Sequence, residues 1–127
     1  MQEFVYFKTN GSFFQVSISD IRYIEAVNKY AKVITSKKVH LITISMCCLE
    51  KKLPSDLFCR IHRSYIISLR HTSHFDNEAA YIADTTMALP IGKQYKGILQ
   101  QRLFVICNDE KDHAPSFITE PGRFIAN

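Results

Sequence analysis

The sequence has few of the residues that build phosphate-binding loops or catalytic sites. It has only four glycines in 127 residues, and no serine stands in a G-x-S-x-G setting. These features exclude a glycine-rich nucleotide loop and the nucleophile elbow of hydrolases. The carboxylates are scattered, with no pair on one convincing strand or helix face. We therefore predict that the chain is not an enzyme and needs no cofactor.

Long apolar runs are also missing. No run approaches the roughly 18 residues that span a membrane. The start at Met1 has no basic stretch followed by an apolar one, which a secretory signal would need. We expect a cytoplasmic protein that does not associate with membranes.

The sequence has no cysteine framework and no paired metal ligands. Four cysteines stand at positions 47, 48, 59 and 107, a spacing that does not resemble a disulfide framework. We expect all four to be reduced thiols. Cys59, His62, His71 and His74 are close in sequence, but no C-x-x-C or H-x-x-x-H pair exists. Cys59 and His62 are three residues apart in a predicted strand, so they point to opposite faces. We predict no metal site.

Positive charge is clustered along the chain. The net charge is +4, but residues 29–70 carry a local net charge of +7 and residues 91–103 a charge of +3. Residues 72–90 have a net charge of −3 and residues 104–127 one of −2. Clusters of this kind attract a phosphate backbone. Taken alone, they are equally typical of a solvated basic face without a partner.

The hydrophobic pattern predicts a mainly β domain. A length of 127 residues suits one domain. Asn10-Gly11 is a hairpin turn signal, and Ser45 can cap a helix that ends at Leu53 before Pro54. A second helix is expected at 93–105 from apolar residues at helical spacing. The predicted strands are 4–7, 13–18, 21–26, 30–35, 39–44, 59–62, 65–69, 74–75, 80–82 and 87–89. We place the domain at residues 1–106, followed by an extension of unknown role at 107–127.

The run from Phe58 to Ile67 mixes core and charged residues. Arg60, His62 and Arg63 cannot all be buried, because an unpaired guanidinium is expensive to desolvate. One interpretation is a structural salt bridge with surface charge beside it. The other is a row of donors, including the Ser64 hydroxyl, that faces phosphates or base edges. The chemistry of the run leaves both open.

Four ordered blocks resemble the LytTR family of DNA-binding domains. They are Ile21–Ala26 with Tyr30, Leu49–Pro54 leading to Phe58, Arg60–Ile66, and Leu89–Tyr95. The resemblance runs from about Phe4 to Leu103. It implies an elongated arrangement of small antiparallel sheets, with loops and strand ends in successive major grooves of duplex DNA. It also implies sequence-specific DNA binding as a bacterial transcription regulator in two-component (response regulator) signalling.

The resemblance assigns the DNA contacts to three segments, which we call the first, second and third segments. In this chain they consist of Asn28, Lys29, Tyr30, Ala31 and Lys32; His62, Arg63 and Ser64; and Gly92, Lys93 and Gln94. Family members often have a polar side chain where Ala31 stands, so base contacts there are expected from Tyr30 or Lys32. The acidic residues 72–90 are expected to face away from the duplex. Arg60 is expected to be structural, paired with Glu25 or Asp20.

The family also implies partners. A receiver domain usually precedes this domain, and a start at Met1 leaves no room for one. We therefore expect a shortened form or a stand-alone regulator controlled in another way. One small module buries too little surface for tight specific binding, so we expect two copies on double-stranded promoter repeats. The alternative function is a β-class protein-interaction module that binds a signalling partner such as a sensor kinase.

Overall fold

The protein was examined as a computed structural model, which describes residues 3–108. The strands are β1 (Phe4–Thr9), β2 (Ser12–Ser17), β3 (Ile21–Val27), β4 (Tyr30–Thr35), β5 (Val39–Ile42), β6 (Phe58–His62), β7 (Tyr65–Ser68), β8 (Thr72–Phe75), β9 (Ala79–Ile82) and β10 (Ala88–Pro90). The α-helices are α1 (Met46–Lys52) and α2 (Ile98–Arg102). Short 3₁₀ turns are η1 (Ile18–Asp20), η2 (Leu69–His71) and η3 (Lys93–Tyr95).

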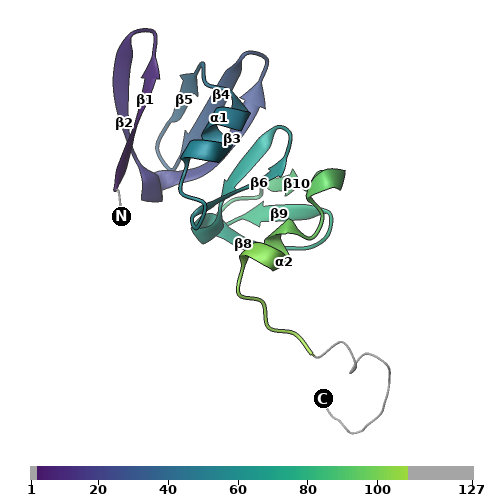
Figure 1. The fold of residues 1–127 in the computed structure, drawn as a ribbon. Coiled ribbons are helices and arrows are strands. Elements are labelled where there is room, and N and C mark those ends of the chain that lie inside the picture. Colours follow the sequence, from purple (N-terminus) through teal and green to yellow (C-terminus); the bar gives the residue numbers. More distant parts are fainter. Residues whose placement is uncertain (1–2, 109–127) are drawn as a thin grey trace, which may run out of the picture.

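The strands form three antiparallel sheets. The β1–β2 hairpin is followed by a five-stranded sheet of order β5-β4-β3-β7-β6 and a three-stranded sheet of order β10-β9-β8. The three sheets follow one another along the molecule, as Figure 1 shows. The predicted fold class, mainly β with small antiparallel sheets and two helices, is confirmed.

The five-stranded sheet is covered on both faces, which produces two cores. On one face, Ile24 and Ile66 pack with the β1–β2 hairpin and with Leu49 of α1. On the other face, Tyr23 and Ile67 pack with the three-stranded sheet and α2. Neighbouring residues of one strand point to opposite faces. The central strands β3 and β7 are therefore apolar at consecutive positions, as expected for strands buried on both sides.

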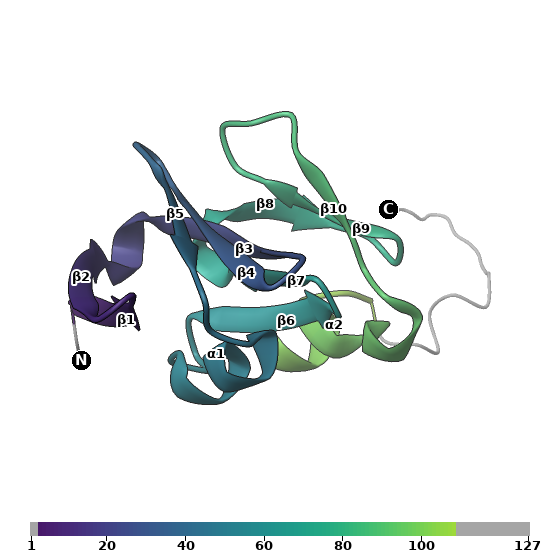
Figure 2. The same ribbon diagram turned by 90° about the horizontal axis from the view of Figure 1, so that it is seen from above.

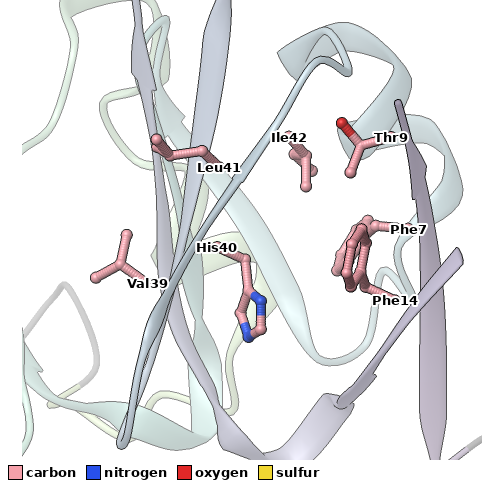
Figure 3. Close-up of a pocket in the computed structure, with 7 residues that line it drawn as sticks. All are labelled: Phe7, Thr9, Phe14, Val39, His40, Leu41 and Ile42. Atoms are coloured by element: carbon pink, nitrogen blue, oxygen red, sulfur yellow. The ribbon is translucent and has the colours of Figure 1, made fainter. Parts of the chain in front are cut away.

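The edge strand β5 shows how the hairpin covers the first face. His40 and Ile42 point toward Phe7 and Phe14 of the hairpin, whereas Val39 and Leu41 point to the opposite side (Figure 3). A cleft of about 240 Å³ lies between the hairpin and β5. Val39 and Leu41 remain exposed, because the second core covers the sheet toward β6 and includes no residue of β5.

Two local signals form the structures predicted from them. Asn10 and Gly11 both have positive φ angles, 52° and 79°, as a tight hairpin turn requires. The Ser45 hydroxyl accepts a hydrogen bond from the Cys48 amide at 3.1 Å and caps α1.

The helix predicted at 93–105 is wrong in extent. The segment forms η3, then breaks at Gly97, whose φ is +83°, and resumes as the five-residue helix α2. A left-handed residue cannot continue a right-handed helix. Within residues 3–108, no helix has the length and hydropathy needed to cross a membrane. Residues 107–108 are exposed and irregular, and the rest of the predicted extension, 109–127, lies outside the described residues.

Candidate nucleic-acid interface

The three predicted segments lie at one edge of the molecule. β3 pairs with β7, and beyond the ladder the Ala26 amide donates to the Ser64 carbonyl at 2.9 Å. The Gly92 amide donates to the Ile61 carbonyl at 2.8 Å. The β3–β4 turn, the β6–β7 turn and the chain after β10 are therefore neighbours in this order. Figures 1 and 2 show them side by side.

The first segment begins at the β3–β4 turn. Asn28 has a φ of 55° and forms the turn, and Lys29 beside it is exposed. Tyr30 is 44% exposed at the start of β4. The Lys32 ammonium lies 4.0 Å from a carboxylate oxygen of Glu25. That carboxylate lowers the charge that Lys32 offers to a partner, so Lys29 and Tyr30 are the better contact groups of this segment.

Ala31 requires a correction. Its side chain is only 1% exposed and belongs to the first core. Alternation along β4 places Ala31 and Val33 on the buried face, opposite Tyr30 and Lys32. A methyl group buried there is not available to a partner, so the Ala31 side chain does not belong to the predicted contact surface.

Arg60 supports the second segment through side-chain hydrogen bonds. Its guanidinium donates to the Arg63 carbonyl at 2.8 Å, to the His62 carbonyl at 3.3 Å and to Glu50 of α1 at 3.1 Å. The expected structural role of Arg60 agrees with these contacts, but its expected partners, Glu25 and Asp20, were wrong. Glu25 lies beside Lys32 and Tyr65, and Asp20 accepts a hydrogen bond from Ser36.

His62 and Arg63 present donors from the braced turn. The Nδ1 atom of His62 accepts the Ser64 amide at 3.0 Å. In the neutral ring the proton is therefore on Nε2, which donates to no described residue. The Arg63 side chain is exposed and forms no ion pair or hydrogen bond with any described residue. Its planar guanidinium is suited to bidentate contact with phosphate or guanine.

The third segment packs against the second. A Cβ added at Gly92 would lie 3.2 Å from Tyr95 Cδ2 and 3.4 Å from His62 Cδ2, so glycine permits this close approach. A cleft of about 230 Å³ lies between the two segments. It is lined by His62, Arg63, Gly92, Lys93, Gln94 and Tyr95. The structure thus brings five predicted residues together.

Tyr95 is the cleft residue that sequence reasoning missed. The helical spacing of residues 93–105 suggested a core position, and Tyr95 does pack against the second core, but it also ends η3 and lines the cleft. The signal available in the sequence was its place at the end of the Leu89–Tyr95 block.

The acidic stretch at 72–90 is closer to the interface than expected. The Ile91 amide donates to the Glu78 carbonyl at 2.9 Å, so the β8–β9 turn lies beside the third segment. A Glu78 carboxylate oxygen lies 3.4 Å from the Lys96 ammonium. Lys96 is partly neutralised, and Lys93 is the exposed cation that this segment presents.

Two tyrosine phenols behind the turns have raised pKa values. Burial, the Glu25 charge and a hydrogen bond donated to Glu25 raise the pKa of Tyr65. Burial, with a smaller contribution from Glu25, also raises the pKa of Tyr23. Both phenols therefore stay protonated at neutral pH. Among the described residues, no three His, Cys, Asp or Glu side chains are arranged to hold a metal ion.

The sequence model of the LytTr DNA-binding domain matches residues 11–104, about three quarters of the chain. The chain belongs to the LytTr DNA-binding domain family. The resemblance in the four sequence blocks is thereby confirmed. The LytTr match spans β2 to α2 and so includes all three segments.

Two relatives show the LytTr domain as part of larger regulators. The chain is 29% identical to the sensory transduction protein LytT of Bacillus cereus over 92 residues, which cover 69% of this chain and 37% of LytT. It is 31% identical to the CO-responsive transcriptional regulator RcoM of Rhodospirillum rubrum over 83 residues, which cover 61% of this chain and 35% of RcoM. The chain thus spans little more than a third of the length of these relatives.

A solved LytTr domain has the same fold. It comes from a protein of Bacillus cereus titled a methyl-accepting/DNA response regulator. The superposition covers 80% of this chain and 97% of that domain, with a TM-score of 0.67 and 23% identity.

Proposed function

We propose that this LytTr domain binds duplex DNA in a sequence-specific way and regulates transcription in a bacterium. The proposal depends on one observation, which is that the three segments lie side by side at one edge of the molecule. Exposed Lys29, Arg63 and Lys93 lie there beside polar donors. Arg63 reads a base edge, and His62, Gln94 and Tyr30 supply further polar contacts. Lys29 and Lys93 bind phosphates, because a flexible ammonium suits a point charge better than a planar base edge.

Support comes from the relatives of the chain. The proteins LytT and RcoM are named for signal transduction and transcriptional regulation. The chain acts by binding and not by catalysis, in the cytoplasm where bacterial DNA lies. Two copies bind repeated half-sites in a promoter, since one module of this size buries too little surface for tight specific binding. Control by a receiver domain or a sensor kinase is part of the same proposal.

The first test replaces the proposed base reader. A cognate site is first selected from a random duplex pool. Arg63→Ala should then weaken cognate binding by about 1–3 kcal/mol, the range of one bidentate base contact. Stability should change by less than about 0.5 kcal/mol, because the side chain is exposed. Unchanged affinity in a mobility-shift titration removes Arg63 from the set of base contacts.

The second test separates phosphate contacts from base contacts. Lys29→Gln and Lys93→Gln should each weaken cognate and scrambled duplexes equally. Each should also reduce the slope of log affinity against log salt by roughly 0.9. Lys37→Gln is the matched control, because exposed Lys37 lies in the β4–β5 turn at the opposite end of β4. If Lys37→Gln reduces the slope as much as the other two, the interface is on the wrong edge.

The salt titration also tests the alternative function. A protein-interaction module uses an aromatic surface, and this chain exposes Phe13, Phe14 and Tyr6 on the β1–β2 hairpin. Binding through such a surface depends little on salt. Selection of no preferred duplex, with weak salt dependence of partner binding, would favour the interaction module over the DNA reader.

A further inference from the structure

A second cleft lies away from the three segments. Its volume is about 340 Å³, and it lies between the first half of β3, the end of β4 and the β9–β10 loop. Thr35, Ser36 and Thr85 line it together with apolar Ile34 and Met87. Each of the three hydroxyls donates its proton within the protein, to the Lys38 carbonyl, the Asp20 carboxylate and the Ile82 carbonyl respectively. Such a mixture of a few polar groups with apolar walls is typical of sites for small organic ligands.

Arg22 lines this cleft and lacks adequate partners. One terminal nitrogen of its guanidinium donates to the Ala83 carbonyl at 3.4 Å, a long hydrogen bond. Its Nε atom is buried and is the only buried side-chain nitrogen or oxygen without a hydrogen bond among the described residues. No carboxylate of the described chain lies within 4.0 Å of the guanidinium.

A partly buried guanidinium without a counter-ion is costly. Desolvation of a charge is offset only when an opposite charge or several hydrogen bonds compensate it. A guanidinium with so few acceptors therefore calls for an explanation, and an ion or ligand that contacts its terminal nitrogens is one. Arg60, by contrast, is also partly buried but has three acceptors, one of them a carboxylate.

We propose that this cleft binds a small organic monocarboxylate. The acid group lies against the terminal nitrogens of Arg22, and a short apolar body packs against Ile34 and Met87. A dianion such as a phosphate ester fits less well, because among the described residues Arg22 is the only cation that lines the cleft, and acidic Asp84 also lines it.

The ligand and the duplex occupy different parts of the molecule. Arg22 is the second residue of β3, and the first DNA segment begins beyond the other end of that strand. At roughly 3.3 Å per residue, the two are about 20 Å apart. The cleft joins the five-stranded sheet to the β9–β10 loop of the three-stranded sheet, so its occupation does not block the DNA contacts. The proposal does not depend on DNA binding.

The experiment is a titration of the ¹⁵N-labelled chain with 4-methylpentanoate, followed by amide chemical shifts. The neutral isostere 4-methylpentanamide has nearly the same shape and serves as the ligand control. Saturable shifts are expected at residues 22–23, 34–36 and 82–87, with the acid binding at least tenfold more tightly than the amide. Arg22→Gln should reduce acid binding to the level of the amide. The control Arg102→Gln changes an exposed side chain of α2 and should bind the acid as the wild type does.

Thermal unfolding gives a second readout that needs no assignment. The acid should raise the melting temperature of the wild type and leave that of Arg22→Met unchanged, with the amide inactive on both. Equal binding of acid and amide, or acid-induced shifts confined to other parts of the chain, overturns the proposal. Inorganic phosphate that binds this cleft as tightly as the acid also overturns it, because the apolar body would then contribute nothing.

Discussion

Replacing Arg60 by methionine removes the guanidinium that braces the second segment while keeping an unbranched apolar stem. Three acceptors lose their donor, namely the carbonyls of His62 and Arg63 and the carboxylate of Glu50. The Arg60 side chain is 15% exposed, and that of Glu50 is 46% exposed. The carbonyl contacts are therefore the better-shielded part of the network.

These geometries set the expected loss. A hydrogen bond that involves a charged group contributes about 1.5–3 kcal/mol to stability, and the 2.8 Å contact to the Arg63 carbonyl is the strongest candidate. The half-exposed ion pair adds about 0–1 kcal/mol. Arg60→Met should then cost about 2–4 kcal/mol. Arg60→Lys should cost somewhat less, because it keeps a charged donor. It should still destabilise the chain, because an ammonium cannot reproduce the guanidinium fork. Glu50→Gln should cost less than about 1 kcal/mol.

Urea unfolding of the three variants measures these differences, and a mobility shift on the cognate duplex measures their effect on the interface. We expect Arg60→Met to weaken cognate binding about tenfold at a temperature where it is fully folded, because the turn that presents Arg63 loses its support. The reasoning is refuted if Glu50→Gln destabilises the chain as much as Arg60→Met. It is equally refuted if Arg60→Met unfolds at the wild-type urea concentration.

Four further changes test other parts of the structure. Gly97→Ala should lower stability by about 1 kcal/mol in urea unfolding without altering DNA affinity, because φ is +83° and no atom crowds the new Cβ closer than 3.7 Å. Gly92→Ala should instead affect mainly DNA affinity. The added Cβ displaces His62 and Tyr95, so cognate binding should weaken in a mobility shift. Two backbone amides hold the pKa of Asp76 below its usual value. Their contribution is present above the unfolded-state pKa of about 3.9 and lost as pH falls through the lower folded-state pKa, so Asp76→Asn should flatten acid unfolding below pH ~4. Glu78→Gln should release Lys96 and raise affinity for any duplex, with a salt slope steeper by up to roughly 0.9.

The parts of the fold that could be predicted are those decided by neighbouring residues. Asn10-Gly11 specifies a tight turn by its own backbone preferences, and Ser45 caps the helix that begins next to it. The break at Gly97 was also encoded locally, but helical spacing of the apolar residues concealed it. The spacing arises because η3 and α2 both contact the second core through Tyr95 and Leu99.

The contacts that could not be predicted depend on the order of strands in space. Glu50 and Arg60 pair because α1 packs against β6, which no local pattern reveals. The position of Ala31 is a different case. The family resemblance assigned a whole segment to the interface, although the alternation of Tyr30, Ala31, Lys32 and Val33 already indicates that Ala31 shares the apolar face with Val33.

The second core has a particular part in the interface, because the three segments come from two sheets. The first and second segments belong to one hydrogen-bonded sheet, and the β3–β7 ladder fixes their separation. The third segment follows β10 of the other sheet and is held by the Gly92–Ile61 hydrogen bond and by burial of Ile91 and Leu99. Protein cores are close-packed, so a change of volume there shifts the layers on either side of it. A change in the second core therefore moves Lys93 relative to Arg63. A change in the first core, between the hairpin, α1 and the opposite face, alters stability while leaving that separation intact.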